Sequence, residues 1–215
     1  QDLVRSPVPI KVQLGKSITQ GLGAGGRPEV ARQAAEESVE DIHKMLADNT
    51  KMVFITAGMG GGTGTGASPI VAKTAHDMGI LTVGIVTIPF AFEGNLKIRQ
   101  ALEGVVALSE YVDAILVINN EKLKNIYPDL NLSNAFAKAD DVLTNAAKAI
   151  AEIITISGYI NIDFADVSTI MRDGKVAIMN TGYASGENRI TRAIEDALTS
   201  PLLNTNDVKG AKKVL

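Results

Sequence analysis

The stretch GMGGGTGTGASP, residues 58–69, contains six glycines and two threonines in twelve residues. The apolar run MVFITA (residues 52–57) precedes it, and a stretch with helical character (residues 68–78) follows it. Glycine allows another group to approach the backbone closely, and the start of a helix presents unpaired N–H groups with a partial positive charge. The sequence therefore predicts a phosphate-binding loop between a strand and a helix. A tight turn with a purely structural purpose is the alternative.

The spacing of these glycines does not identify the phosphate compound. The P-loop pattern G-x-x-x-x-G-K-[ST] occurs nowhere in the chain. Gly62, Gly64 and Ala67 fit the looser G-x-G-x-x-A form of the dinucleotide fingerprint, which so glycine-rich a stretch matches easily. Thr63 and Thr65 add hydroxyl groups that can bond phosphate oxygens or help to hold a metal ion.

The composition indicates one sizeable folded domain, or one domain and part of a second. The 215 residues are 46% hydrophobic and 21% charged, with a net charge of −3. No basic stripe with interleaved aromatic residues is present, so we do not expect nucleic-acid binding. The absence of cysteine excludes disulfides, thiolate metal sites and a cysteine nucleophile. No membrane-length apolar run and no signal peptide is visible, so we expect a cytoplasmic protein without direct membrane insertion.

Strand-like and helical segments alternate along the first half of the chain. Runs that are apolar throughout are typical of parallel strands buried between helices on both faces of a sheet. The carboxyl ends of such strands meet at one edge, so we expect the loops that follow Ala57, Ile88 and Ile118 to surround one crevice. The predicted strands are residues 8–15, 52–57, 81–88 and 114–120, and the predicted helices are residues 29–47, 68–78 and 96–111.

A long helix separates this region from the rest of the chain. Apolar residues recur at helical spacing from residue 133 to about residue 155, which corresponds to about 33 Å at 1.5 Å per residue. A strand at residues 175–184 and a helix at residues 188–200 follow. We therefore divide the chain into a nucleotide-binding domain at residues 1–132, a central helix at residues 133–157 and the start of a second α/β domain at residues 158–215.

Several stretches, in this order, are similar to the tubulin/FtsZ family, and within it to the bacterial cell-division GTPases rather than to the tubulins. GGGTGTG (60–66) matches the family signature, GLGAGGRPEVARQAAEES (21–38) resembles its third nucleotide loop with the next helix, and VTIPFAFEG (86–94) resembles its ribose-side loop. AFAKADDVL (135–143), GYINIDFADVSTIM (158–171) and GENRITRAIEDALTSPLL (186–203) resemble its central helix, its synergy loop and a helix of its second domain.

The resemblance implies a Rossmann-like GTPase sheet, GTP or GDP as the ligand, and Mg²⁺ with it. It also implies a head-to-tail homopolymer that forms the division ring at mid-cell in the cytoplasm. Division adaptor proteins would bind through regions absent from this sequence. The family's first strand and first phosphate loop precede the first residue here, and the sequence starts without methionine, so we expect a fragment of a longer product.

The resemblance also assigns roles to residues. Glu93 would bond the ribose, Asn120 and Asp140 would read guanine, Phe136 would stack on it, and Lys97 stands where the family usually has arginine. Asp163, Asp166 and Asn161 would trigger hydrolysis on the adjacent subunit. The residues implied around the phosphates are Gly60, Gly61, Gly62, Thr63, Gly64, Thr65, Gly66, Ala24, Gly25 and Gly26.

Each assignment has a structural alternative. Phe136 can be a core residue, Asp140 and Asp141 can lie on a solvated helix face, and Asp163 can cap the next helix. However, Asp140 lies near the start of the long helix and Asp163 lies beyond its end, so they are about 30 Å or more apart and one chain cannot use both on one nucleotide. Catalysis by Asp163 therefore requires a neighbouring subunit, and a head-to-tail contact that does not close generates a filament.

Two other functions fit part of the pattern. A dinucleotide-binding module of a dehydrogenase would have an acidic residue about 20 positions after the glycines, where residues 83–87 offer none. A non-hydrolysing structural member of the tubulin superfamily would bind GTP and assemble without turnover. The presence of Asn161, Asp163 and Asp166 argues against it.

Overall fold

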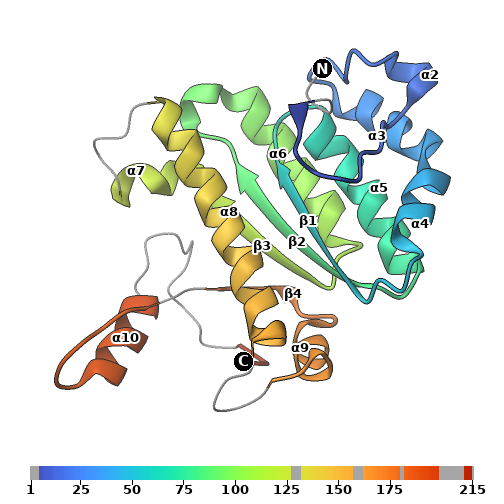
Figure 1. Ribbon diagram of the computed structural model, residues 1–215. Helices are drawn as coiled ribbons and strands as arrows, with labels where there is room; N and C mark the ends of the chain where they lie inside the picture. Colours follow the sequence, from blue (N-terminus) through green and yellow to red (C-terminus); the bar gives the residue numbers. More distant parts are fainter. Residues whose placement is uncertain (1–4, 127–131, 157–161, 180–181, 199–210, 215) are drawn as a thin grey trace.

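A parallel β-sheet forms the centre of the chain. The computed structural model describes residues 5–126, 132–156, 162–179, 182–198 and 211–214 (Figure 1). The four strands pair in sequence order and in parallel. They are β1 (Met52–Gly58), β2 (Leu81–Ile88), β3 (Ala114–Asn119) and β4 (Lys175–Val176). The predicted parallel α/β sheet is confirmed, and its three longer strands lie within one residue of the predicted ranges.

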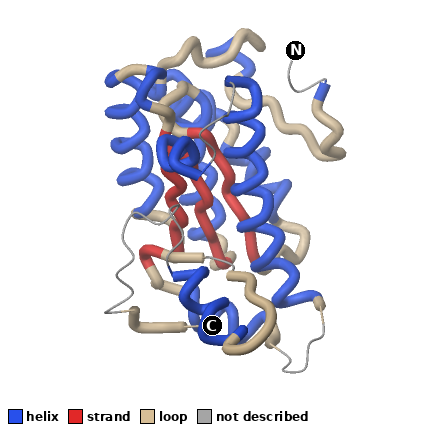
Figure 2. Tube along the Cα trace, turned by 90° about the vertical axis from the view of Figure 1, so that its left-hand side faces the viewer, coloured by secondary structure: helices blue, strands red, loops and turns tan. Residues whose placement is uncertain are grey.

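Helices cover both faces of this sheet, as predicted (Figure 2). Helices α5 (Thr63–Asp77) and α6 (Asn95–Ser109) pack on one face, and α8 (Leu132–Thr155) crosses the opposite face. Helices α3 (Pro28–Glu37) and α4 (Val39–Leu46) pack against α5. The shorter or more peripheral helices are α2 (Lys16–Thr19), α7 (Leu123–Ile126), α9 (Phe164–Met171) and α10 (Arg189–Leu198).

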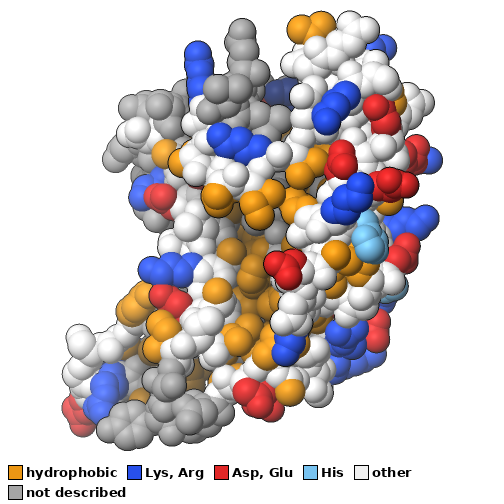
Figure 3. All heavy atoms as spheres, turned by 45° about the vertical axis from the view of Figure 1, so that its right-hand side comes forward, with side chains coloured by type: hydrophobic (Ala, Val, Ile, Leu, Met, Phe, Trp, Pro, Cys, Tyr) orange, Lys and Arg blue, Asp and Glu red, His pale blue; other side chains and the backbone are white. Residues whose placement is uncertain are grey.

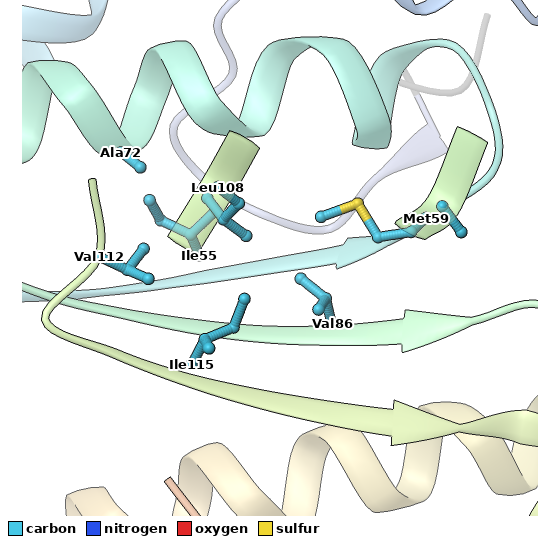
Figure 4. Close-up of a cluster of buried hydrophobic side chains, with 8 residues drawn as sticks. Ile55, Met59, Ala72, Val86, Leu108, Val112 and Ile115 are labelled. Carbon is cyan, nitrogen blue, oxygen red and sulfur yellow. The ribbon is translucent and has the colours of Figure 1, made fainter. Parts of the chain in front are cut away.

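The hydrophobic core has one layer on each face of the sheet. On one face, Ile55, Val86 and Ile115 from the strands meet Leu108 of α6 and Ala72 of α5 (Figure 4). On the other face, Val83, Ile85 and Ile118 contact apolar side chains of α8, including Leu143 and Ala147. The residues of β2 alternate between these layers, because successive side chains of a strand point to opposite faces. Strand β2 is therefore the buried central strand.

Helix α5 begins earlier than the sequence predicts. The expected start is Ser68, but the helix starts at Thr63, so the second half of the glycine-rich stretch forms its first turn. A Cβ atom on Gly64 would collide with the carbonyl oxygen of Gly58, and one on Gly66 would collide with that of Pro28. Glycine is a poor helix former, but here the absence of a side chain lets the helix approach the end of β1 and α3 closely.

The strand predicted at residues 8–15 is wrong. This segment has no regular secondary structure in the described part of the chain, and the short helix α2 follows it. Leu14 packs against a cluster that contains Ile42, Leu46 and Ala75. A strand needs a neighbour that shares its backbone hydrogen bonds, and none of the four described strands pairs with this segment. Apolar character alone therefore does not make these residues a strand.

The helix predicted at residues 29–47 is interrupted at Ser38. The backbone of this residue departs from helical geometry (φ −105°, ψ 14°) and separates α3 from α4. Its buried hydroxyl oxygen accepts a hydrogen bond of 2.9 Å from the backbone N–H of Gly15. This contact joins residues 23 positions apart, so the helical periodicity carries no sign of the break.

The region after α8 contains a shorter strand than predicted. Of the predicted strand at residues 175–184, Lys175 and Val176 form β4 at the edge of the main sheet, beside β3. The backbone N–H of Lys175 donates to the carbonyl oxygen of Asp113, and the Asp113 carboxylate accepts a bond of 2.9 Å from Thr82. Residues 180–181 lie outside the described part. The division of the chain at residue 158 stays a prediction.

The close contact at Gly66 predicts a loss of stability in Gly66→Ala. Alanine would normally improve a helix interior by about 1 kcal/mol, but here its methyl group collides with Pro28 and lies 3.0 Å from Cβ of Ala31. We expect the free energy of unfolding, measured by urea titration, to fall by about 1–3 kcal/mol.

Gly61→Ala is the matched control, because no atom lies within 4 Å of the position of its Cβ. We expect its unfolding free energy to stay within about 0.5 kcal/mol of the unsubstituted chain. Equal stability of the two variants would contradict the packing role assigned to Gly66.

Candidate functional site

The loops that follow β1 and β2 contact each other at the carboxyl edge of the sheet (Figure 1). Gly60 has a positive φ of 94°, and a Cβ atom there would lie 2.7 Å from the carbonyl oxygen of Lys97 and 3.0 Å from Pro89. The backbone N–H of Met59 donates to the carbonyl oxygen of Thr87 at 3.0 Å. The glycine-rich loop therefore lies directly against the segment at residues 89–97, as the sequence predicts.

The glycine-rich loop places the start of α5 at this edge. Gly62 is the N-cap residue, and no side chain among the described residues caps the helix, which therefore has unpaired N–H groups in its first turn. The hydroxyl of Thr65 is buried and accepts a 2.8 Å bond from the N–H of Gly60, so it stabilises the loop itself. Thr63 is exposed. The threonine hydroxyl that can reach a ligand is therefore that of Thr63.

A second glycine-rich segment lies beside the first. The Cβ position of Gly62 is 2.9 Å from Cβ of Ala24 and 3.0 Å from the backbone nitrogen of Arg27. Gly25 and Gly26 lie between these two contacts in the chain, both with positive φ and with open space where a side chain would be. The structure thus brings residues 24–26 next to residues 60–66, which the sequence alone predicts only by resemblance.

Three phenylalanines pack together beyond the end of β2. The rings of Phe90 and Phe92 stack with centroids 5.1 Å apart, and Phe136 of α8 meets Phe90 edge-on at 5.5 Å. Phe90 is completely buried, whereas Phe92 is 53% exposed and Phe136 is 41% exposed. Phe136 is therefore not simply a core residue, because part of its surface remains available to a planar ligand.

The Glu93 carboxylate has a hydrogen-bond donor and an ion-pair partner that were not predicted from the sequence. It ends the 3₁₀ helix η1 (Ala91–Glu93), and its carboxylate accepts a 3.0 Å bond from the N–H of Phe90. Its other oxygen pairs with Nζ of Lys97 at 3.2 Å. The spacing of four residues between Glu93 and Lys97 is the signal that could have revealed this pair. Glu93 and Lys97, which the resemblance places near the nucleotide, are thus in direct contact.

The loop after β3 contains an unsatisfied buried group. Asn120 opens the 3₁₀ helix η2 (Asn120–Lys122) and is only 4% exposed. Its side-chain oxygen has no hydrogen-bond partner among the residues that the structure describes. Burial of an unpaired acceptor is unfavourable, so this oxygen is suited to a ligand that donates a hydrogen bond.

Glu121 connects the loops after β2 and β3 and was not among the predicted site residues. Its Oε2 accepts a 2.8 Å bond from the backbone N–H of Ala91, and its Oε1 accepts a 2.7 Å bond from Lys124. The hydrogen bond from Lys124, followed by that from Ala91, holds the pKa of the Glu121 carboxyl below its usual value. Its spacing to Lys124 indicates an ion pair, but nothing in the sequence indicates the bond to Ala91.

Asp140 and Asp141 of α8 have different surroundings. Asp140 lines an open groove of about 600 Å³ between α8 and β1, together with Phe54, Thr56 and Leu143. On the face of the molecule that Figure 3 displays, hydrophobic side chains lie in a hollow in the middle. Asp141 pairs with Lys138 at 3.2 Å on the exposed surface. Asp140 and Asp141 are both exposed, so the solvated-face alternative describes both residues, and Asp140 in addition borders the groove.

The acidic residues after α8 lie far from these loops. Helix α8 begins near the carboxyl edge of the sheet and ends near α9 at the opposite end of the molecule (Figure 1). Its 24 residues correspond to about 36 Å. Asp163 caps α9, and its carboxylate and that of Asp166 each accept a bond from the other's backbone N–H, at 2.9 and 3.1 Å. The capping alternative is thus confirmed for Asp163. Asn161 lies outside the described residues.

Other kinds of site find no support in the described part of the chain. Within these residues, no group of three or more histidine, aspartate or glutamate side chains could hold a metal ion. None of the described helices has both the length and the apolar character needed to cross a membrane. The loops at the carboxyl edge of β1–β3 therefore form the candidate site.

Comparisons with known proteins agree with this arrangement. Residues 1–128 match the family described as "Tubulin/FtsZ family, GTPase domain", and residues 175–215 match "FtsZ family, C-terminal domain". A Porphyromonas gingivalis protein named "Cell division protein FtsZ" is 61% identical over 216 residues, which is 100% of this chain and 47% of that relative. The chain spans about half the length of the curated relatives it matches.

Solved structures share the fold. The structure described as "FtsZ dimer, empty (M. jannaschii)" has a TM-score of 0.89 at 46% identity, and the match covers 94% of this chain and 59% of that one. The structure described as "CetZ2 from Haloferax volcanii - GTPgS bound protofilament" has a TM-score of 0.69 at 25% identity, and the match covers 86% of this chain and 55% of that one. The motifs, the fold and these matches agree, and the chain belongs to the tubulin/FtsZ family.

Proposed function

We propose that this chain carries the nucleotide site of an FtsZ-type GTPase, which binds GTP and hydrolyses it to GDP and phosphate. The observation that carries the proposal is a convergence at one edge of the sheet. The glycine-rich loop, the segment at residues 89–94 and the loop that contains Asn120 meet there, and Phe136 in the first turns of α8 packs against Phe90. The match to a GTPase domain over residues 1–128 supports it. The CetZ2 structure is described as bound to GTPgS, an analogue of GTP.

The phosphates would lie on the glycine-rich loop. The backbone N–H groups at the start of α5 and the dipole of this helix favour an anion there, and residues 24–26 flank the same place. The described residues offer no all-protein metal site, so Mg²⁺ would be held mainly by the phosphates, with the exposed Thr63 hydroxyl as a protein ligand. When bound, it would offset the charge of the triphosphate.

The guanosine would lie on the opposite side of the site. Phe136 would stack on the base with the exposed part of its ring, and Glu93 would bond the ribose. The unsatisfied Asn120 oxygen and the Asp140 carboxylate are acceptors, and guanine presents donors at N1–H and its exocyclic amine. Adenine lacks the N1–H donor, so these acceptors would favour GTP over ATP.

Hydrolysis would require two subunits. Asp163 and Asp166 lie at the end of the molecule opposite to the nucleotide loops, separated from them by α8. A neighbour stacked head-to-tail would bring its α9 to this nucleotide, and such a contact extends into a filament. Of the two solved structures, one is described as a dimer and the other as a protofilament. The relatives are named as cell division proteins, which supports a role in the bacterial division ring, with adaptor proteins as further partners.

The alternative functions make different predictions. Residues 83–87 of β2 contain no acidic side chain and are paired on both sides in the sheet, which leaves a dehydrogenase module without its ribose-binding acid. In the second alternative Asp163 and Asp166 only stabilise α9 through their reciprocal capping bonds, and the polymer does not hydrolyse GTP.

Dependence on protein concentration tests the proposed function. The measurement uses the extended protein, which is this chain supplied with the flanking sequence of the Porphyromonas gingivalis relative. We expect GTP hydrolysis per chain to be negligible at low concentration and to rise above a threshold, because the complete site exists only between subunits. A rate per chain that does not depend on concentration would contradict catalysis between subunits, and binding of NAD without GTP would support the dehydrogenase.

A double substitution separates catalysis from capping. Asp163→Ser with Asp166→Gln replaces one capping box by another, since serine is a good N-cap and glutamine at the third position can return the bond. We expect the thermal stability and the GTP affinity of the extended protein to be nearly unchanged. Turnover in the polymer should fall by about 10²–10⁴-fold, because both carboxylates are absent.

Light scattering measures whether each variant still polymerises. The single variant Asp166→Gln, which keeps the Asp163 carboxylate, is the control with which assembly of the double variant is compared. Turnover that stays normal in the double variant would assign Asp163 and Asp166 to capping only.

A further inference from the structure

We propose that Glu121 is a positioning residue of the nucleotide site: it fastens the segment at residues 90–93 to the loop after β3 and thereby holds the guanosine side of the site in its binding geometry. This inference rests on the proposed function. The described contacts of the Glu121 carboxylate are with Ala91 and Lys124.

Glu121 and Ala91 form a hydrogen bond between the loops after β3 and β2. Its 2.8 Å length is typical of a strong hydrogen bond to a carboxylate, and it joins two loops that are 30 residues apart in sequence. Glu121 is held in place in turn, because its own N–H donates to the side-chain oxygen of Asn119 at 3.0 Å. The loop after β2 is thus attached to the rigid end of β3.

Lys124 contacts both Glu121 and the aromatic rings beside it. Its ammonium group bonds the other Glu121 oxygen at 2.7 Å and lies 5.3 Å from the ring centre of Phe92 and 5.9 Å from that of Phe90. A cation at this distance from an aromatic ring is attracted to it. Glu121 therefore orients Lys124 over the rings that pack against Phe136, the residue proposed to stack on guanine.

The segment at residues 90–93 also contains Glu93. Phe90 donates its backbone N–H to Glu93, the residue proposed to bond the ribose, so a shift of residues 90–91 would move Glu93 as well. Ala91 is exposed, and water can replace the lost bond to its N–H. Loss of the Glu121 carboxylate should therefore affect the order of the segment, and hence affinity, more than global stability.

Nucleotide affinity and amide exchange together test this role in the extended protein. In Glu121→Ala we expect the dissociation constants of both GTP and GDP to rise by about tenfold, because the two ligands share the guanosine that the segment holds. Hydrogen exchange at the amide of Ala91 should become faster. Glu103→Ala is the matched control, because it removes an exposed carboxylate of α6 that takes no part in these contacts, and it should leave both measurements unchanged.

Glu121→Gln shows which interaction is responsible. Glutamine keeps an oxygen that can accept from Ala91, so we expect its affinities to lie closer to the unsubstituted protein than to Glu121→Ala. Unchanged GTP and GDP affinities in Glu121→Ala would overturn the inference, as would a loss confined to GTP. If the unsubstituted extended protein binds neither nucleotide, the proposed function itself is wrong, and that outcome is distinguishable from the others.

Discussion

The close approach of α5 to the end of β1 and to α3 is the constraint on which the rest of the site depends. Gly64 lies against the carbonyl of Gly58 and Gly66 against that of Pro28, so the first turn of the helix packs backbone to backbone on both elements. This contact fixes the start of α5 at the carboxyl edge of the sheet and holds the segment around Ala24 beside it. The glycines are therefore required by the protein's own packing, and the exposed backbone at the same place is suited to an anion.

Much of the fold could be predicted because its signals are local. The strands at β1, β2 and β3 are continuous apolar runs, and α8 has a clear helical period. The errors arise where distant contacts decide. Residues 8–15 are apolar but have no described strand beside them, Ser38 bends a helix through its bond to Gly15, and α5 includes glycines that helix propensity disfavours. Each outcome depends on a partner that the local pattern does not contain.

The candidate site shows the same division. The glycine-rich loop is predicted from its composition, and the other residues of the site from their resemblance to a family. The interactions among them were not predicted: Thr65 bonds Gly60, Glu93 pairs with Lys97, and Glu121 bonds Ala91. These contacts determine which side chains remain available to a ligand. They leave the hydroxyl of Thr63 and the oxygen of Asn120 unused, a distinction that residue types alone could not make.

Helix α8 has a consequence for the geometry of any assembly. Because α8 runs without a break over its 24 residues from the carboxyl edge of the sheet toward α9, its length sets the distance between these two parts of the subunit. In subunits that stack with α9 on the carboxyl edge of the next copy, α8 would contribute up to about 36 Å to the repeat along the filament axis. Lengthening or shortening α8 by one turn would then change this axial repeat by up to about 5 Å, so the length of a single helix would contribute directly to the spacing of subunits.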